Sequence, residues 1–172
     1  MKRLLMLLVL TAGSIASASA SAGENKRQYS TFANDDDQPW QESNYALPSY
    51  PSEGDWVGFF VHHSLQNQYF VDAKSVSVPD EQVVRYVVKV VSPSGAVNLT
   101  AEGIQCRQKR FRTYAFGDTV NRRWIESMKP DWRSIEYDDL MRRRLHENLC
   151  QDNWAPKTPA EAVAMLRKAP WR

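Results

Sequence analysis

The sequence predicts an α+β fold: a single domain with an antiparallel meander of five or six strands followed by C-terminal helices. Residues 56–116 hold short runs of β-branched and aromatic residues, separated by short turns. Short turns join only antiparallel neighbours, because parallel strands need a long crossover. After Gly117 the apolar residues recur at helical spacing. Strands that precede helices in this way are typical of the α+β class.

We expect strands wherever β-branched and aromatic residues cluster, at residues 56–63, 68–73, 75–78, 83–92, 97–106 and 110–116. The alternation is clearest at residues 83–92, where the side chains separate into two faces. One face is apolar and should face the core; it carries Val84, Tyr86, Val88 and Val90. The other face is mixed; it carries Val83, Arg85, Val87, Lys89 and Val91.

Turn residues separate these strands. Residues 79–82 read Pro-Asp-Glu-Gln and residues 92–95 read Ser-Pro-Ser-Gly, and both patterns are typical of turns. Gly95 can adopt the positive φ that such a turn often requires. Gly103 interrupts the strand at 97–106, and we expect a β-bulge there.

Two helices are expected after the strands. The first covers residues 137–149, with an apolar face of Tyr137, Leu140, Met141, Leu145 and Leu149. Acidic residues near its start and arginines further along suit the helix dipole. Thr158, followed by Pro159 and by Glu161 three residues later, forms a capping box. It opens a short second helix that ends near Ala169.

Residues 1–22 have the pattern of a secretory signal peptide. Lys2 and Arg3 form a basic start, residues 4–10 are wholly apolar, and small residues in A-x-A order follow at 16–22. The apolar run is too short to span ~30 Å of hydrocarbon, which disfavours a membrane anchor. The mature chain should begin at Ser19, Ser21 or Gly23. We therefore expect a periplasmic or secreted protein.

Beyond the signal peptide the composition suggests three segments. Residues 23–38 form a polar, acidic tail that should be disordered. Residues 39–152 form the α+β domain, and residues 153–172 form a C-terminal extension with a short helix. Within the domain, aromatic and proline residues between 40 and 51 suggest an extended arm that lies on the domain.

Charge balance and the distribution of apolar residues argue against two classes of protein. Lys2 and Arg3 are two of the 22 basic residues, so the mature chain balances 20 basic against 20 acidic residues. A nucleic-acid-binding protein usually has a basic excess, so that function is disfavoured. Only one strongly apolar run exists, which excludes a multi-span membrane protein and leaves no span in the mature chain.

The mature chain contains two cysteines, Cys106 and Cys150. An even number in an oxidising compartment indicates a disulfide. The alternative, a redox or metal-binding pair, needs C-x-x-C spacing or nearby histidine ligands. The sequence has neither.

The sequence resembles the cryptic neisserial protein family of exported envelope proteins from Gram-negative bacteria. The matching elements, in order, are 40–42 (Trp-Gln-Glu), 47–51 (Leu-Pro-Ser-Tyr-Pro), 70–72 (Phe-Val-Asp), 75–78 (Ser-Val-Ser-Val), 83–86 (Val-Val-Arg-Tyr), 92–96 (Ser-Pro-Ser-Gly-Ala) with Asn98, 102–106 (Glu-Gly-Ile-Gln-Cys), 114–117 (Tyr-Ala-Phe-Gly), Trp124, Trp132 and Cys150. The resemblance covers about residues 40–150 and leaves out the C-terminal helix. It is weaker at 80–82, where the family tends to a tighter, glycine-containing turn. It implies an exported single domain with a cysteine pair, and it supplies no catalytic residue to carry over.

The residues themselves do not indicate catalysis. The sequence contains no nucleophile elbow, phosphate-binding loop or H-E-x-x-H motif. His62 and His63 are adjacent on an expected strand, so their side chains point to opposite faces. His146 lies on the first helix. No catalytic residue, metal site or cofactor is therefore expected.

The region most suited to binding is basic and aromatic. Residues 105–125 hold six basic residues and one acidic residue, a net charge of +5. Guanidinium groups beside aromatic rings can bind carboxylates or phosphates. The candidate binding residues are Arg107, Arg110, Arg112, Tyr114, Arg122 and Trp124. The ligand would be an anionic envelope component, such as a peptidoglycan fragment or lipid head group, or an acidic protein segment.

Two other interpretations of this region stay open. It could be a solvated strand face over an aromatic core. Alternatively, residues 23–55, with a net charge of −5, could fold back onto it, Asp35–Asp37 among them.

We therefore expect an exported binding or structural module of the cell envelope, without catalytic activity. The alternative is a periplasmic enzyme that acts on an envelope polymer, peptidoglycan or a lipid-linked substrate. That alternative requires Asp72, His62 or Glu102 to converge in one pocket. The sequence does not define the oligomeric state.

Overall fold

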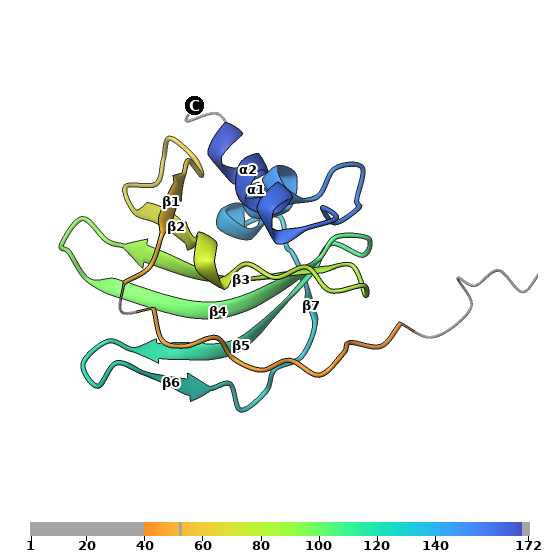
Figure 1. The fold of residues 1–172 in the computed structure, drawn as a ribbon. Coiled ribbons are helices and arrows are strands. Elements are labelled where there is room, and N and C mark those ends of the chain that lie inside the picture. The colour runs from red at the N-terminus through yellow and green to blue at the C-terminus, as the bar shows by residue number, and fades with distance from the viewer. Residues whose placement is uncertain (1–39, 52, 170–172) are drawn as a thin grey trace, which may run out of the picture. The chain divides into compact units, whose positions relative to one another are not determined.

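The computed structural model describes residues 40–51 and 53–169. The expected signal peptide (1–22) and acidic tail (23–38) lie outside the described residues. The described chain begins with an extended segment, continues through a sheet and ends with two helices (Figure 1). This order confirms the predicted α+β class and its antiparallel meander.

Successive strands of the sheet lie side by side. They are β1 (Trp56–Phe59), β2 (Gln68–Asp72), β3 (Val83–Val91), β4 (Val97–Gln105), β5 (Arg110–Asp118) and β6 (Arg123–Glu126), in that spatial order. The two-residue strand β7 (Arg133–Ser134) pairs with the start of β5, whereas β6 pairs with its end. All pairs are antiparallel.

Two α-helices follow the sheet, and polar side chains begin both. Helix α1 (Leu140–Leu149) starts where the Asp139 carboxylate accepts a hydrogen bond from the Arg142 backbone, at 3.1 Å. This cap places the start three residues later than the apolar pattern predicts. Helix α2 (Pro159–Lys168) starts at the expected capping residue, because the Thr158 hydroxyl accepts a hydrogen bond from the Glu161 backbone at 3.1 Å.

The segment at 75–78 is not a strand, although its alternation predicts one. Asp72 ends β2 and caps a short 3-10 helix, η2 (Ala73–Ser75), by accepting a hydrogen bond from the Lys74 backbone. The Ser75 hydroxyl donates to the Asp72 carbonyl at 2.7 Å and closes the same turn. An isolated bridge between Ser77 and Arg85 is the pairing that remains. Conversely, the sequence pattern did not predict strand β6, which the structure forms.

The β-bulge also lies elsewhere than expected. Gly103 pairs regularly with Arg85 on β3 and with Arg112 on β5. The register shifts between Ala101 and Glu102, so that Tyr114 is the extra residue on β5. The prediction relied on the conformational freedom of Gly103, but cross-strand packing sets the position of the bulge.

Both faces of strand β3 are buried from Val83 to Val88, and the last three residues of the strand are half-buried. Val84, Tyr86 and Val88 pack under α1 and α2, as predicted, and we call this side the helix-covered face. Val87, which is out of phase with them, belongs to a separate apolar cluster on the opposite side. Residues 40–51, the N-terminal arm, cover that side, which we call the arm-covered face (Figure 1). The mixed face of β3 is therefore also interior.

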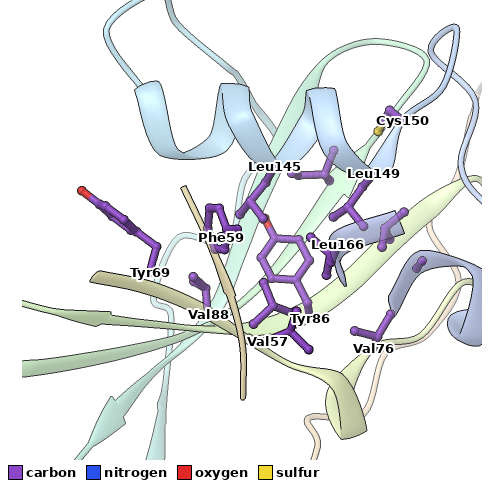
Figure 2. Packing of buried hydrophobic residues seen from close by; sticks show 14 of the residues in the cluster. Val57, Phe59, Tyr69, Val76, Tyr86, Val88, Leu145, Leu149, Cys150 and Leu166 are labelled. Atoms are coloured by element: carbon purple, nitrogen blue, oxygen red, sulfur yellow. The ribbon is translucent and has the colours of Figure 1, made fainter. Parts of the chain in front are cut away.

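Tyr86 occupies the centre of the helix-covered core. Figure 2 shows its ring between Val57 of the sheet and Leu145 and Leu166 of the helices. Its hydroxyl is buried and has no hydrogen-bond partner among the described residues. Burial, and then the nearby Glu102 carboxylate, raise the pKa of Tyr86 well above its ordinary value.

An ion pair and a disulfide both fasten α1 to β4 and the residue that follows it. The buried Glu102 carboxylate accepts hydrogen bonds from Arg142 at 2.6 Å and 3.0 Å. Cys106 and Cys150 form the predicted disulfide, with their Cα atoms 5.4 Å apart. The bond joins the end of β4 to the end of α1, across a sequence separation of 44.

Replacing Cys106 and Cys150 together with Ala should lower the free energy of unfolding by about 2–4 kcal/mol, because the bond closes a long loop. Urea denaturation with and without a reducing agent measures the change. The reductant should destabilise the wild type and leave the double variant unchanged. Two free thiols in the folded protein would contradict the assignment.

Candidate functional site

The N-terminal arm crosses the sheet without joining it as a strand. Among the described residues, no backbone–backbone hydrogen bond links the arm to the sheet. Side chains hold it instead: the Tyr45 ring lies 4.3 Å from that of Tyr114, and Trp124 Nε1 donates to the Pro48 carbonyl at 2.8 Å. These contacts confirm the extended arm that the aromatic and proline residues predicted.

One carboxylate of the arm receives hydrogen bonds from β3, from β5 and from the residue before β7. Arg85 Nη2, at 3.1 Å, and the Tyr114 hydroxyl donate to Oε1 of Glu42. Arg112 Nη1 and Trp132 Nε1, the latter at 3.0 Å, donate to Oε2. A carboxylate offers about four lone-pair positions, so its hydrogen-bonding capacity is filled. We call these five residues the Glu42 cluster.

Gly103 makes room for this cluster. Its neighbours in register are Arg85 on one side and Arg112 on the other, so one row of the sheet reads Arg-Gly-Arg. A Cβ atom on Gly103 would lie 2.6 Å from the Tyr114 hydroxyl. The missing side chain thus lets Tyr114 reach between the two arginines.

Glu81 balances the charges of the cluster. Arg85, which is only 3% exposed, also donates to Glu81, and the Ser43 hydroxyl of the arm donates to the same carboxylate at 2.8 Å. Two guanidinium groups, of Arg85 and Arg112, therefore face two carboxylates, of Glu42 and Glu81. This pairing permits burial of groups that would be costly to bury alone.

Burial fixes the protonation of the phenols around Glu42. Burial raises the pKa of Tyr45 to about 12. Burial, and then the hydrogen bond to Glu42, raise the pKa of Tyr114 even further from its ordinary value. Burial alone would lower the pKa of Arg85, but its contacts with Tyr114, Glu42 and Glu81 raise it. At neutral pH, Tyr114 therefore keeps its proton and acts as a hydrogen-bond donor, and Arg85 keeps its positive charge.

A cleft of about 460 Å³ lies beside the cluster. Its walls are the arm on one side and the β5–β6 region on the other; they include Glu42, Asn44, Leu47, Arg112, Tyr114, Glu126, Ser127 and Pro130. Glu42 and Arg112 are therefore accessible from this cleft. The Arg112 side chain is 27% exposed, and its Nε has no hydrogen-bond partner in the described part of the chain.

Four of the six candidate binding residues lie on the arm-covered face. Arg112 and Tyr114 coordinate Glu42, and Trp124 contacts the arm. Arg110 follows the same alternation and donates to the Trp132 carbonyl at 2.6 Å. Arg107 and Arg122 lie instead in the turns at opposite ends of β5, ~27 Å of strand apart. These two residues do not join the other four.

Sequence reasoning missed three members of the cluster: Glu42, Arg85 and Trp132. A charge in the middle of the valine-rich strand β3 was the available indication, because a buried guanidinium requires a partner. The partner could not be named from the sequence, since Glu42 precedes Arg85 by 43 positions. The interpretation that the acidic segment folds back onto the basic region holds for Glu42, which binds Arg112. Asp35–Asp37 lie outside the described residues.

The residues required by the enzyme alternative have separate partners. Asp72 accepts a hydrogen bond from the Asp55 backbone at 2.9 Å, beside its role at η2. His62 contacts Ser64 in the β1–β2 loop, and Glu102 binds Arg142 of α1. Within residues 40–51 and 53–169, no three His, Cys, Asp or Glu side chains group as metal ligands would.

The fold and the site define a small disulfide-bonded α+β domain whose sheet is covered by helices on one face and by an N-terminal arm on the other. The chain belongs to the CNP1-like family, which matches residues 35–167. The match includes nearly all of α2, which the resemblance over residues 40–150 left out.

The chain is similar to Cryptic neisserial protein 1 of Neisseria gonorrhoeae (strain ATCC 700825 / FA 1090). The two sequences are 25% identical over an alignment of 189 positions, which covers 97% of this chain and 91% of the relative. No solved structure matches the chain. Neither described helix has the length and apolar character needed to cross a membrane.

Replacing Glu42 with Gln should lower the free energy of unfolding by about 3 kcal/mol, because two arginines lose their shared charge partner in a buried site. Thermal or urea denaturation measures the loss. Glu126→Gln is the matched control, since Glu126 is exposed on the same cleft; it should change stability by no more than ~0.5 kcal/mol. Equal effects of the two changes would show that the cluster contributes nothing specific.

Gly103→Ala should cost about 1–3 kcal/mol, because the new methyl group meets the Tyr114 hydroxyl. The same substitution should cost clearly less in a Tyr114→Phe background, where that hydroxyl is absent. Denaturation of the two single variants and the double variant tests this. Strict additivity would mean that Gly103 is needed for some other reason.

Proposed function

We propose that this protein is an exported binding module of the cell envelope that takes an anionic ligand and has no catalytic activity. The secretory pattern of residues 1–22 supports export to the periplasm or beyond. The disulfide agrees with that destination, because disulfides persist in oxidising compartments.

The observation that carries the proposal is the complete coordination of a carboxylate on the arm-covered face. A surface that supplies four donors to one carboxylate has the chemistry of an anion receptor. The cleft beside it is within the size range of small-molecule sites. Catalysis would need in addition a positioned nucleophile or acid–base pair, and the described residues around this cleft suggest none.

The candidate ligands are an anionic envelope component, such as a peptidoglycan fragment or a lipid head group, and an acidic protein segment. The ligand-binding residues would be Arg110, Arg112, Tyr114 and Trp124 on the arm-covered face, and Arg107 and Arg122, in the turns at the two ends of β5, would add attraction at longer range. Their guanidinium groups would attract the ligand, and the aromatic rings would provide contact area.

Binding to anionic envelope material should weaken as salt rises, because exposed charges are screened over ~30 Å at 0.01 M salt but only ~8 Å at 0.15 M. Co-sedimentation of the mature protein with isolated peptidoglycan and with phosphatidylglycerol vesicles across that salt range measures this. Arg110→Glu with Arg122→Glu should reduce binding at low salt about tenfold or more.

The matched control also reverses two charges: Lys157→Glu with Lys168→Glu changes two exposed lysines, one just before α2 and one at its end, and should leave binding nearly unchanged. Binding that ignores salt and survives the double reversal would contradict the proposed surface. Absence of binding to both materials at low salt would contradict the envelope-binding function itself.

A further inference from the structure

We propose that the Glu42 cluster is a receptor for a carboxylate presented by an extended peptide, and that the N-terminal arm is its exchangeable internal occupant. This inference rests on the proposed function and narrows its ligand from anions in general to a glutamate-containing peptide. Arg85, Arg112, Tyr114 and Trp132 form the receptor, and Glu42 occupies the position of the ligand carboxylate.

The receptor is assembled largely from parts that do not depend on the arm. Arg85 is held by Glu81, a residue of the β2–β3 connection. Tyr114 fits into the space above Gly103, and Arg85 Nε donates to its hydroxyl oxygen at 3.3 Å. The Trp132 carbonyl is held by Arg110, which positions the indole that donates to Glu42. The donors are therefore preorganised for a carboxylate.

The charge of the empty receptor would suit a monoanion. Without Glu42, the guanidinium groups of Arg85 and Arg112 would face Glu81 alone, which leaves a net charge of +1. A carboxylate restores neutrality, whereas a phosphate dianion would overcompensate and lie close to Glu81. The donors also fall two on each oxygen, as the planar carboxylate requires.

The contacts on either side of Glu42 define the peptide that would fit. Two residues before it, the Trp40 ring packs against Trp132 with centroids 5.3 Å apart. Three residues after it, the Tyr45 ring packs against Tyr114 at 4.3 Å. The receptor thus selects an extended segment in which aromatic residues flank a glutamate at these spacings.

The manner in which the arm is held permits exchange. It contributes no strand pairing to the sheet, so no ladder of backbone hydrogen bonds has to break. The adjoining cleft opens onto Glu42 and Arg112, which gives an incoming carboxylate a route to the cluster. Replacement can then proceed donor by donor, because Arg112 is the most exposed of the arginines that bind Glu42.

The test uses a peptide with the sequence of residues 40–51 and blocked ends. Glu42 supplies its only ionisable carboxylate, so a second peptide with Gln at that position is a neutral match. Calorimetric titration measures both peptides against the full-length mature wild type, Glu42→Gln and, as control, Glu147→Gln, which neutralises an exposed glutamate of α1 outside the cleft. The Glu42→Gln protein should bind the Glu peptide about tenfold or more tightly than the wild type does, and tenfold or more tightly than the Gln peptide. Glu147→Gln should behave as the wild type.

Equal affinity of folded Glu42→Gln for the two peptides, or no gain over the wild type, would overturn the inference. If that variant does not fold, Trp40→Ala replaces it, because this change loosens the arm without removing a donor to the carboxylate. Trp40→Ala should show the same gain in affinity for the Glu peptide. The absence of that gain would equally overturn the inference. Salt-dependent binding of the wild type to envelope material, without any effect of Glu42→Gln, would reject the inference and leave the proposed function standing. Peptide exchange without binding to envelope material would support the inference, and it would exclude peptidoglycan and anionic lipid as ligands of the proposed function, leaving the acidic protein segment.

Discussion

The position of Arg85 in the middle of β3 constrains everything on the arm-covered face. A guanidinium that the sheet buries must find compensating charge and filled hydrogen bonds, or the fold loses several kcal/mol. Glu81 supplies part of that compensation from the turn before β3, and Glu42 supplies the rest from the arm. The absent side chain at Gly103 serves the same site, because it leaves room for the Tyr114 hydroxyl that donates to Glu42.

The two faces of the sheet use the same device. On the helix-covered face, the Glu102 carboxylate of β4 holds Arg142 of α1; on the arm-covered face, the Glu42 cluster holds the arm. Buried ion pairs add little net stability, but removing one partner is costly, so they fix position more than they add strength. In this domain they fix where a helix and an extended arm lie on an otherwise apolar sheet. The disulfide adds a covalent link on one face, whereas the arm depends on side chains alone.

The sequence predicted the local features of this structure better than its long-range pairings. The alternation at 83–92, the capping residue Thr158 and the disulfide were all predictable, since each depends on local periodicity, capping chemistry or a cysteine count. The bulge was predicted at Gly103 but lies at Tyr114, because cross-strand packing determines its position. The candidate site was only partly predicted: Arg112 and Tyr114 stood out by local charge and aromaticity, but their partner Glu42 lies about 70 positions away. No short-range pattern encodes that contact.

A double-mutant cycle between Glu42 and Arg112 tests most directly whether the cluster holds the arm. Glu42→Gln, Arg112→Met and the double variant are compared with the wild type by urea denaturation at neutral pH. If the two side chains stabilise the arm through each other, the coupling energy lies between about 1 and 3 kcal/mol. Effects that add to within ~0.3 kcal/mol would show that the two residues act independently, and would contradict the central role of the Glu42 carboxylate in holding the arm.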